Sequence, residues 1–397
     1  MSAALVFTPL NYVGWGALDQ LLPVVNKFQV TKILLVADPI LHELSLTDQV
    51  ANPLRDNGYE VDMYTDIVPE PPLESAEKLI AYAKNSKPEL VIGLGGGSAL
   101  DLAKLAAVLP VQEGTAADYL NLTGTRKIRE KGLPKILIPT TAGTGSEVTN
   151  ISVLSLKGTK DVITHDFLLA DAVIADPKLT LSVPSKVTAA TGIDALTHAV
   201  ESYVSLNSSP ETEALSLHAI RLISRSLRRA VQNGNDKQAR TDMCHGSYIA
   251  GLAFFNAGVA GVHALAYPLG GQFHLSHGES NAVLLPYVMG YVRKACKKKM
   301  ADILNAMGCH SAFLSEEEAS VKCVEELRRI VCDVGIPDTL REYGIVADNI
   351  AKLSQEGEKQ TRLLARSPLP LKKEDIILIY HSALTGCVSE PFHDSKK

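Results

Sequence analysis

The hydrophobic pattern of the chain changes near residue 184, and this change limits the folds that the 397 residues can adopt. Before it, helical stretches alternate with short apolar runs, namely "KILLVAD" (32–38), "ELVIGLGGG" (89–97), "KILIPTTAGTG" (135–145) and "AVIADP" (172–177). Such continuous apolarity is typical of strands covered on both faces, and interspersed helices favour a parallel sheet. After it, helical periodicity dominates. We therefore predict a Rossmann-like α/β domain over residues 1–184 and an all-α domain over 185–397.

The composition excludes several classes of partner. A formal net charge of −5 gives no basic footprint for nucleic acid or anionic lipid. Six cysteines without a CxxC spacing, together with an N-terminus unlike a signal peptide, favour a reducing cytoplasm. The uncharged stretch 247–277 is long enough for a membrane helix, but its histidines, Asn256 and Pro268 oppose that interpretation. We expect a buried helix there, followed by a glycine-bearing turn.

Two small-residue loops follow neighbouring apolar runs. The glycines and serine at 95–98 open a helix, so backbone N–H groups there can approach a phosphate closely. A glycine-rich strand-to-helix turn with no ligand has the same pattern, so this loop alone leaves both interpretations open. The loop "PTTAGTGSE" (139–147) supplies the hydroxyl groups of Thr140, Thr141, Thr144 and Ser146. Because parallel strands end at one edge of a sheet, the two loops can hold a pyrophosphate between them.

Asp38 closes the apolar run that begins at residue 32. A carboxylate at this position can accept hydrogen bonds from ribose hydroxyls and repel a 2′-phosphate, which favours NAD over NADP. A turn-initiating aspartate before Pro39 is the alternative.

The stretch "GIDALTHAVES" places Asp194 and His198 four residues apart, on one face of a predicted helix. His263, at the end of the buried helix, and His277, after the "YPLGGQF" turn that returns the chain, can complete a four-ligand set. Three imidazoles and one carboxylate suit Fe²⁺, Zn²⁺ or Mn²⁺ better than Ca²⁺ or Mg²⁺. We predict a divalent-metal site.

Four motifs in order, "GGGSALDLAK", "PTTAGTGSEVT", "GIDALTHAVESYVS" and "GVHALAYPLGGQFHLSHGESNAVLLP", resemble those of the iron-containing (group III) alcohol dehydrogenases. The resemblance implies an N-terminal nucleotide-binding α/β domain, a C-terminal helical metal-binding domain and at least a homodimer. It implies metal ligation by Asp194, His198, His263 and His277, and substrate-pocket positions at Phe254 and Val162. The implied dinucleotide contacts are Asp38, Gly95, Gly96, Gly97, Ser98, Asp101, Thr140, Thr141, Thr144, Thr149, Lys160 and Leu179.

One position departs from the family pattern. Many members carry a histidine where this chain has Tyr267, and that histidine is often assigned to proton relay. A phenol, with an ordinary pKa of about 10, is a poorer shuttle at neutral pH than an imidazole. His274 can substitute for it, or can pack beside the ligands and support them. Tyr267 and His274 are therefore both candidate catalytic residues, and Pro268 is expected to end the helix that carries Tyr267.

These features predict an alcohol dehydrogenase that interconverts primary alcohols and aldehydes by hydride transfer to and from NAD, with Fe²⁺ or Zn²⁺ as metal. The alternatives on the same architecture are a polyol, lactaldehyde or maleylacetate-type reductase and a zinc-bearing glycerol dehydrogenase. An acidic substrate would require a nearby lysine or arginine, and none lies between residues 241 and 292. A nucleotide sensor would not need four metal ligands, and a metallohydrolase would not need two phosphate-binding loops.

Overall fold

The computed structural model describes residues 4–388, which divide into two compact units. The α/β unit spans Val6–Val183. The helical unit begins at Pro184 and also includes Leu5 and the residue before it.

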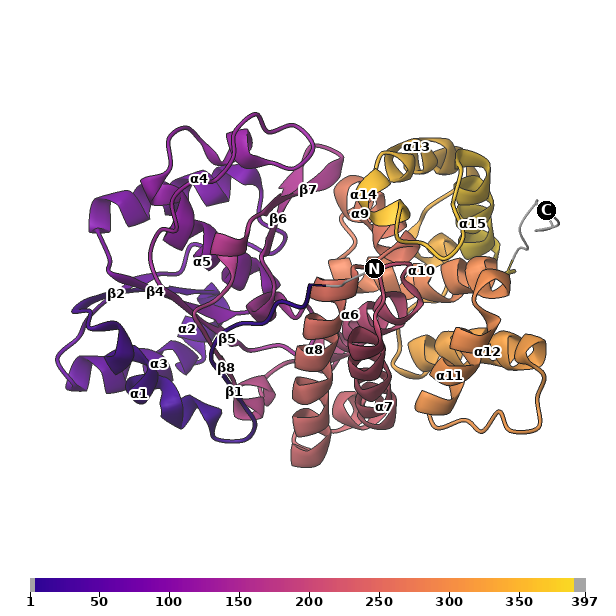
Figure 1. Ribbon diagram of the computed structural model, residues 1–397, viewed down its shortest axis with the longest axis horizontal. Coiled ribbons are helices and arrows are strands. Elements are labelled where there is room, and N and C mark those ends of the chain that lie inside the picture. The colour runs from indigo at the N-terminus through magenta and orange to yellow at the C-terminus, as the bar shows by residue number, and fades with distance from the viewer. Residues whose placement is uncertain (1–3, 389–397) are drawn as a thin grey trace. The chain divides into compact units, whose positions relative to one another are not determined.

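Six parallel strands form the sheet of the α/β unit (Figure 1), in the order β1-β8-β5-β4-β2-β3. Their bounds are Asn11–Val13 for β1, Lys32–Ala37 for β2, Glu60–Tyr64 for β3, Leu90–Gly95 for β4, Lys135–Pro139 for β5 and Ala172–Ala175 for β8. The four inner strands, β8, β5, β4 and β2, are buried along almost their whole length, because helices cover both faces of the sheet. The predicted parallel sheet is confirmed.

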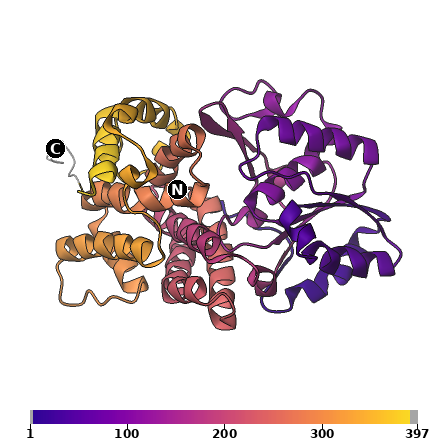
Figure 2. The same cartoon turned by 180° about the vertical axis from the view of Figure 1, so that it is seen from behind.

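Helices α1 and α3 lie on one face of this sheet, and α4 and α5 lie on the other (Figures 1 and 2). The helices of this unit are α1 (Leu21–Val25), α2 (Pro39–Glu43), α3 (Leu46–Asp56), α4 (Leu73–Ser86) and α5 (Gly97–Val108). An antiparallel hairpin of β6 (Ile151–Leu156) and β7 (Thr159–Thr164) follows β5. The order of strands places the ends of β2, β4 and β5 side by side, where the predicted loops begin.

The helical unit consists of α6 (Ser185–Val204), α7 (Pro210–Gln232), α8 (Lys237–Ala257), α9 (Gly261–Phe273), α10 (His277–Val292), α11 (Lys297–Ala306), α12 (Glu316–Asp333), α13 (Ala347–Glu358), α14 (Thr361–Leu364) and α15 (Lys373–Thr385). Helices α6, α7 and α8 pack on one another, and α10 packs on both α6 and α9. Nearly every residue of α6 and α10 is buried, which explains their weak amphipathic pattern.

The stretch 247–277 differs from its prediction. It contains the end of α8 and the whole of α9, and α9 continues through Pro268 to Phe273. A proline inside a helix removes one backbone hydrogen bond, but here the flanking Tyr267 and Leu269 are buried, and that packing stabilises the helix. The predicted helix end at Pro268 and the predicted turn at 267–273 are therefore wrong. The chain reverses after His274, whose backbone is left-handed (φ 56°).

Within residues 4–388, no single helix combines the length and the apolar composition needed to cross a membrane. Helices α8 and α9 meet these two criteria only when they are taken together, and they are bent by 105° relative to each other.

Candidate functional site

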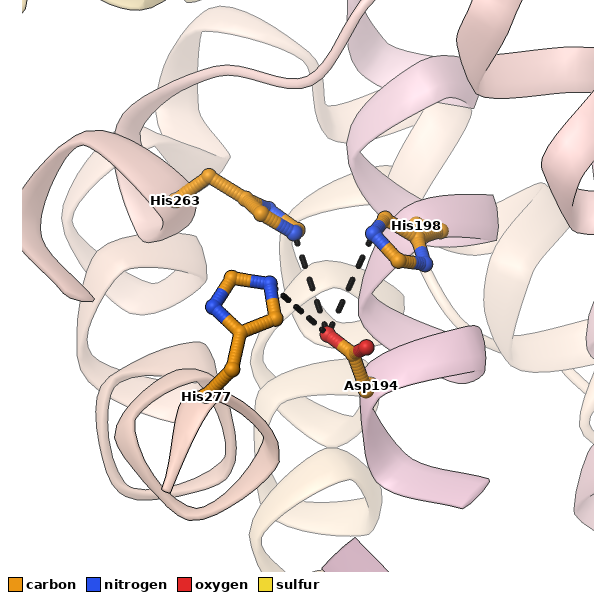
Figure 3. Close-up of side chains that lie close together, drawn as sticks. All are labelled: Asp194, His198, His263 and His277. Atoms are coloured by element: carbon orange, nitrogen blue, oxygen red, sulfur yellow. Dashed lines mark ion pairs between the residues drawn. The ribbon is translucent and has the colours of Figure 1, made fainter. Parts of the chain in front are cut away.

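Four side chains of the helical unit point toward one another (Figure 3). Asp194 and His198 come from α6, His263 from the first turn of α9, and His277 from the first residue of α10. The Oδ1 atom of Asp194 lies 3.9 Å from Nε2 of His198, 3.8 Å from Nε2 of His263 and 3.6 Å from Nε2 of His277. All four ligand atoms lie within 4.8 Å of one another. The structure thus brings together the four residues predicted as metal ligands.

A close approach of two helices places His277 beside Asp194. Gly278, the second residue of α10, lies against Ala190 of α6, and a Cβ atom on this glycine would be 2.3 Å from the Ala190 carbonyl oxygen. No other residue type fits there without moving one helix. The side chain of Ser276 accepts a hydrogen bond from the Glu279 N–H group and so caps α10 at the same point.

Two further residues contact the ligands and were not identified from the sequence. Glu201 is fully buried and hydrogen-bonds Nδ1 of His263 at 2.6 Å. The amide of Asn281 donates to Oδ1 of Asp194 at 2.7 Å and lies 3.2 Å from Nε2 of both His263 and His277. Their spacing could have revealed them, because Glu201 follows Asp194 by seven residues and Asn281 follows His277 by four, which are same-face intervals on a helix.

Aromatic and aliphatic side chains border the cluster. The Phe254 ring stacks on His198, with ring centroids 4.2 Å apart, and the Tyr267 ring lies 6.1 Å from that of His277. They belong to an apolar group formed by Phe254, Val259, Ala264, Tyr267, Leu363 and Leu364. His274, in contrast, is exposed and ends α9, so the expectation that it packs beside the ligands is wrong.

The charges of the cluster suit a cation. Burial by itself would raise the pKa of Asp194, but the three histidines and the Asn281 amide outweigh that effect and hold the pKa below its usual value. The side chain of His277 is 25% exposed, whereas those of the other three are at most 5% exposed. The cluster is therefore least enclosed at His277.

In the α/β unit, the two predicted loops and Asp38 lie together. The Thr140 N–H group donates to the Gly95 carbonyl at 2.9 Å. A Cβ atom on Gly97 would lie 2.8 Å from Cγ2 of Thr144, and one on Gly95 (φ 154°) would lie 2.4 Å from Oδ2 of Asp38. Only glycines allow this approach, which leaves backbone N–H groups at the start of α5 open to a ligand.

Two side chains of the predicted nucleotide site are bonded to nearby backbone. Asp38 accepts a hydrogen bond from the Gly96 N–H group at 3.1 Å, and burial raises the pKa of its carboxyl. The Ser98 hydroxyl accepts one from the Glu70 N–H group at 3.1 Å.

A buried lysine holds the second loop against α5. The Nζ atom of Lys104 lies 3.1 Å from Asp101, 2.7 Å from Ser146 and 3.1 Å from Thr149. Asp101 and Thr149, which were predicted to contact the dinucleotide, are thus engaged with Lys104. Burial lowers the pKa of this lysine and raises the pKa of the neighbouring Glu147 to about 7. Neither Lys104 nor Glu147 was identified from the sequence, because neither stands in a pattern that indicates burial.

The remaining predicted residues of this unit are largely enclosed. Lys160 of β7 forms an ion pair with Glu70. Val162 of the same strand is 2% exposed, and Leu179 is 1% exposed in the core beside the sheet.

A parallel α/β unit with glycine and threonine loops, joined to a helical unit with three histidines and a carboxylate, has the features of a metal-dependent dehydrogenase. The model of "Iron-containing alcohol dehydrogenase" matches residues 9–177, and that of "Fe-containing alcohol dehydrogenase family, C-terminal" matches residues 188–384. The chain therefore belongs to the iron-containing alcohol dehydrogenase family. This membership confirms the resemblance and the expected alcohol dehydrogenase activity.

Similar proteins support the assignment. Long-chain-alcohol dehydrogenase 1 of Geobacillus thermodenitrificans is 67% identical to the chain, over 98% of each. The crystal structure of a 1,3-propanediol oxidoreductase superposes with a TM-score of 0.92 at 33% identity and covers 97% of this chain and 100% of its own. The structure of sulfoacetaldehyde reductase from Bifidobacterium kashiwanohense in complex with NAD⁺ superposes with a TM-score of 0.86 at 26% identity. It covers 96% of this chain and 99% of its own.

Proposed function

We propose that the chain interconverts primary alcohols and aldehydes with NAD as the hydride carrier and a divalent metal held by Asp194, His198, His263 and His277. The convergence of these four ligand atoms in a buried cluster carries the proposal. Three imidazoles and one carboxylate that face one point form a donor set typical of divalent transition-metal sites.

The donor set fits a divalent transition metal. Nitrogen donors from three histidines and one carboxylate oxygen suit Fe²⁺ or Zn²⁺, and the family favours iron. Asp194 and Glu201 are both buried, and within residues 4–388 their ion-pair partners are histidines rather than lysines or arginines. Two negative charges in a buried site are costly unless a cation compensates them, and one divalent ion would do so.

A bound divalent ion would supply a Lewis acid that favours ionisation of an alcohol hydroxyl. The residues of the chain then have separate tasks. The exposed edge of His277 marks where the hydroxyl can enter, and Asn281 orients the Asp194 carboxylate by its 2.7 Å hydrogen bond. The stacked Phe254 ring fixes His198 and excludes water from that side of the cluster.

The α/β unit is proposed to bind NAD. Backbone N–H groups at the start of α5 and the hydroxyls of the Thr140–Thr144 segment suit a pyrophosphate. Asp38, beside Gly95 and Gly96, is placed for ribose hydroxyls and against a 2′-phosphate. The NAD⁺ complex of the related sulfoacetaldehyde reductase supports the same choice.

The substrate is proposed to be a neutral primary alcohol with a long alkyl chain. The relative at 67% identity is a long-chain-alcohol dehydrogenase, which supports this substrate class. The apolar group around Phe254, Tyr267 and Leu363 offers hydrocarbon surface next to the ligands. The absence of lysine and arginine between residues 241 and 292 disfavours acidic substrates.

A substrate panel tests the proposal. Metal-free protein reconstituted separately with Fe²⁺ and Zn²⁺ would be assayed with primary alcohols of increasing chain length and with diols, using NAD and NADP. We expect NADH formation that depends on the metal, favours NAD and increases with chain length. A metal-loaded protein that oxidises none of these alcohols would contradict the proposal.

A further inference from the structure

Glu201 is a buried carboxylate without a role in the proposed chemistry. It lies on α6, one turn after His198, and is 0% exposed. Its Oε1 atom accepts a hydrogen bond from the Val262 N–H group at 2.6 Å, and its Oε2 atom accepts one from the His263 N–H group at 3.4 Å. Oε2 also lies 2.6 Å from Nδ1 of the His263 ring. A single carboxylate thus contacts both the backbone and the side chain of one predicted ligand.

The backbone contacts cap a helix from outside. The first N–H groups of α9 have no partners within the helix, and the residue before it, Ala260, has no side chain that could accept from them. Glu201 accepts hydrogen bonds from two of these N–H groups instead, and it also puts a negative charge at the positive end of the helix. The position of His263, two residues after the start of α9, therefore depends on Glu201.

The ring contact favours one tautomer of His263, because a carboxylate can only accept a hydrogen bond from the ring nitrogen that it faces. A histidine nitrogen binds a metal only when it is unprotonated, and Nε2 is the nitrogen that faces Asp194. The proton of the neutral ring must then lie on Nδ1, where it is donated to Glu201. A carboxylate that fixes the tautomer and the orientation of a ligand histidine in this way strengthens metal binding.

We propose that Glu201 is a positioning residue of the metal centre, which fixes the start of α9, the ring orientation of His263 and its metal-binding tautomer. The inference rests on the proposed function, because it assumes that the four ligands bind a metal. Glutamine cannot replace Glu201, since both arms of the side chain must accept hydrogen bonds and a glutamine has one arm that only donates.

Zinc affinity measured by chelator competition tests this role without recourse to enzyme activity. The proteins are wild type, Glu201→Gln, His263→Ala and the double variant, each prepared metal-free. We expect Glu201→Gln to weaken Zn²⁺ binding by about 10- to 100-fold when His263 is present. In the His263→Ala background the same substitution should change the affinity by about threefold or less, because the ring that Glu201 positions is gone. Glu326→Gln, a buried glutamate of α12 outside the cluster, is the control and should leave the affinity unchanged.

The outcomes separate the inference from the proposed function. A wild-type protein that binds no Zn²⁺ would overturn the metal site itself. If the wild type binds Zn²⁺ and Glu201→Gln binds it equally well, only the role of Glu201 is wrong. An equal loss in both backgrounds, or a Glu201→Gln protein whose circular dichroism shows it unfolded without metal, would show a general structural role and would also overturn the inference.

Discussion

The two units present their functional groups in different ways. In the helical unit, side chains from α6, α9 and α10 meet at one point, and Glu201 and Asn281 orient them. In the α/β unit, side chains of the predicted nucleotide site bond to other groups of the same unit, as Asp101 and Thr149 do with Lys104. Backbone N–H groups, opened by the missing Cβ atoms of Gly95 and Gly97, carry a larger share of ligand binding there, together with Asp38 and the hydroxyls of the Thr140–Thr144 segment. Loss of one side chain should therefore abolish metal binding in the helical unit but only weaken nucleotide binding in the α/β unit.

The largest expected effect is at the metal ligands. His263→Ala or His277→Ala should remove most of the bound metal and abolish activity, because three remaining ligands hold a divalent ion poorly. His274→Ala should keep the metal content and the activity near wild type, since His274 is exposed and lies outside the cluster. Elemental analysis of the purified proteins measures this. A His274→Ala protein without metal, beside a His277→Ala protein that retains it, would reverse the assignment.

A smaller effect is expected at Asp38. Asp38→Gly should raise the KM for NAD by about tenfold or more, because a charge-assisted hydrogen bond contributes roughly 1.5–3 kcal/mol, and should narrow the preference for NAD over NADP. The KM of Asp38→Asn for NAD should lie between those of wild type and Asp38→Gly. The amide oxygen can still accept a hydrogen bond from the Gly96 N–H group, whereas the negative charge is lost. Steady-state kinetics with both cofactors measures the ratio. An unchanged ratio in both variants would make Asp38 a turn residue only.

A still smaller effect is expected at Tyr267, whose ring lies in the apolar group. The kcat of Tyr267→Phe should stay within about threefold of the wild-type value. Tyr267→Ala should alter the preference for alcohols of a given chain length. Kinetics on alcohols of different length would test this. A fall in kcat by the 10²–10⁴ attributed to general acid–base catalysis in Tyr267→Phe, with metal content unchanged, would instead assign the proton relay to the phenol.

The last effect is on stability rather than on activity, and it concerns Glu147. Burial raises the pKa of this carboxyl from 4.5 to about 7. Between pH 4.5 and about pH 7 the Glu147 carboxyl keeps its proton in the folded protein but has lost it in the unfolded chain. The free energy of unfolding therefore falls as the pH rises through this range. The loss is roughly 3 kcal/mol at most. Glu147→Gln should therefore melt a few degrees above wild type at pH 8 and close to it at pH 5. Melting curves that differ equally at both pH values would contradict the buried, titrating carboxyl.

The inner part of the sheet could be predicted from the sequence, but its edges could not. Strands β2, β4, β5 and β8 are buried on both faces and therefore read as continuous apolar runs. The edge strands β1 and β3 and the hairpin β6–β7 are short or carry polar residues, as in "EVDMY" of β3, and give no such run.

The ligand set could be predicted from residue types and spacing, but the surroundings of the ligands depend on packing. A glutamate in a helix is usually exposed, so the same-face spacing of Glu201 and Asp194 does not by itself show that Glu201 is buried. At Pro268, tertiary packing overrides the local rule that a proline ends a helix. His274 lies in an apolar stretch of sequence but is exposed, with a left-handed backbone at the end of α9. Glu201 bonds to Val262 and Tyr267 packs with Leu363, and both contacts join segments that are far apart in the sequence.

X-ray absorption spectroscopy of the Zn²⁺-loaded protein tests the metal centre most directly. The four converging side chains predict one ion per chain, surrounded by nitrogen and oxygen at about 2.0–2.2 Å, with the outer-shell scattering of three imidazoles. The His277→Ala protein should lose one imidazole or the ion itself. A sulfur shell at about 2.3 Å, or a spectrum with fewer than two imidazoles in the wild type, would contradict the site formed by Asp194, His198, His263 and His277.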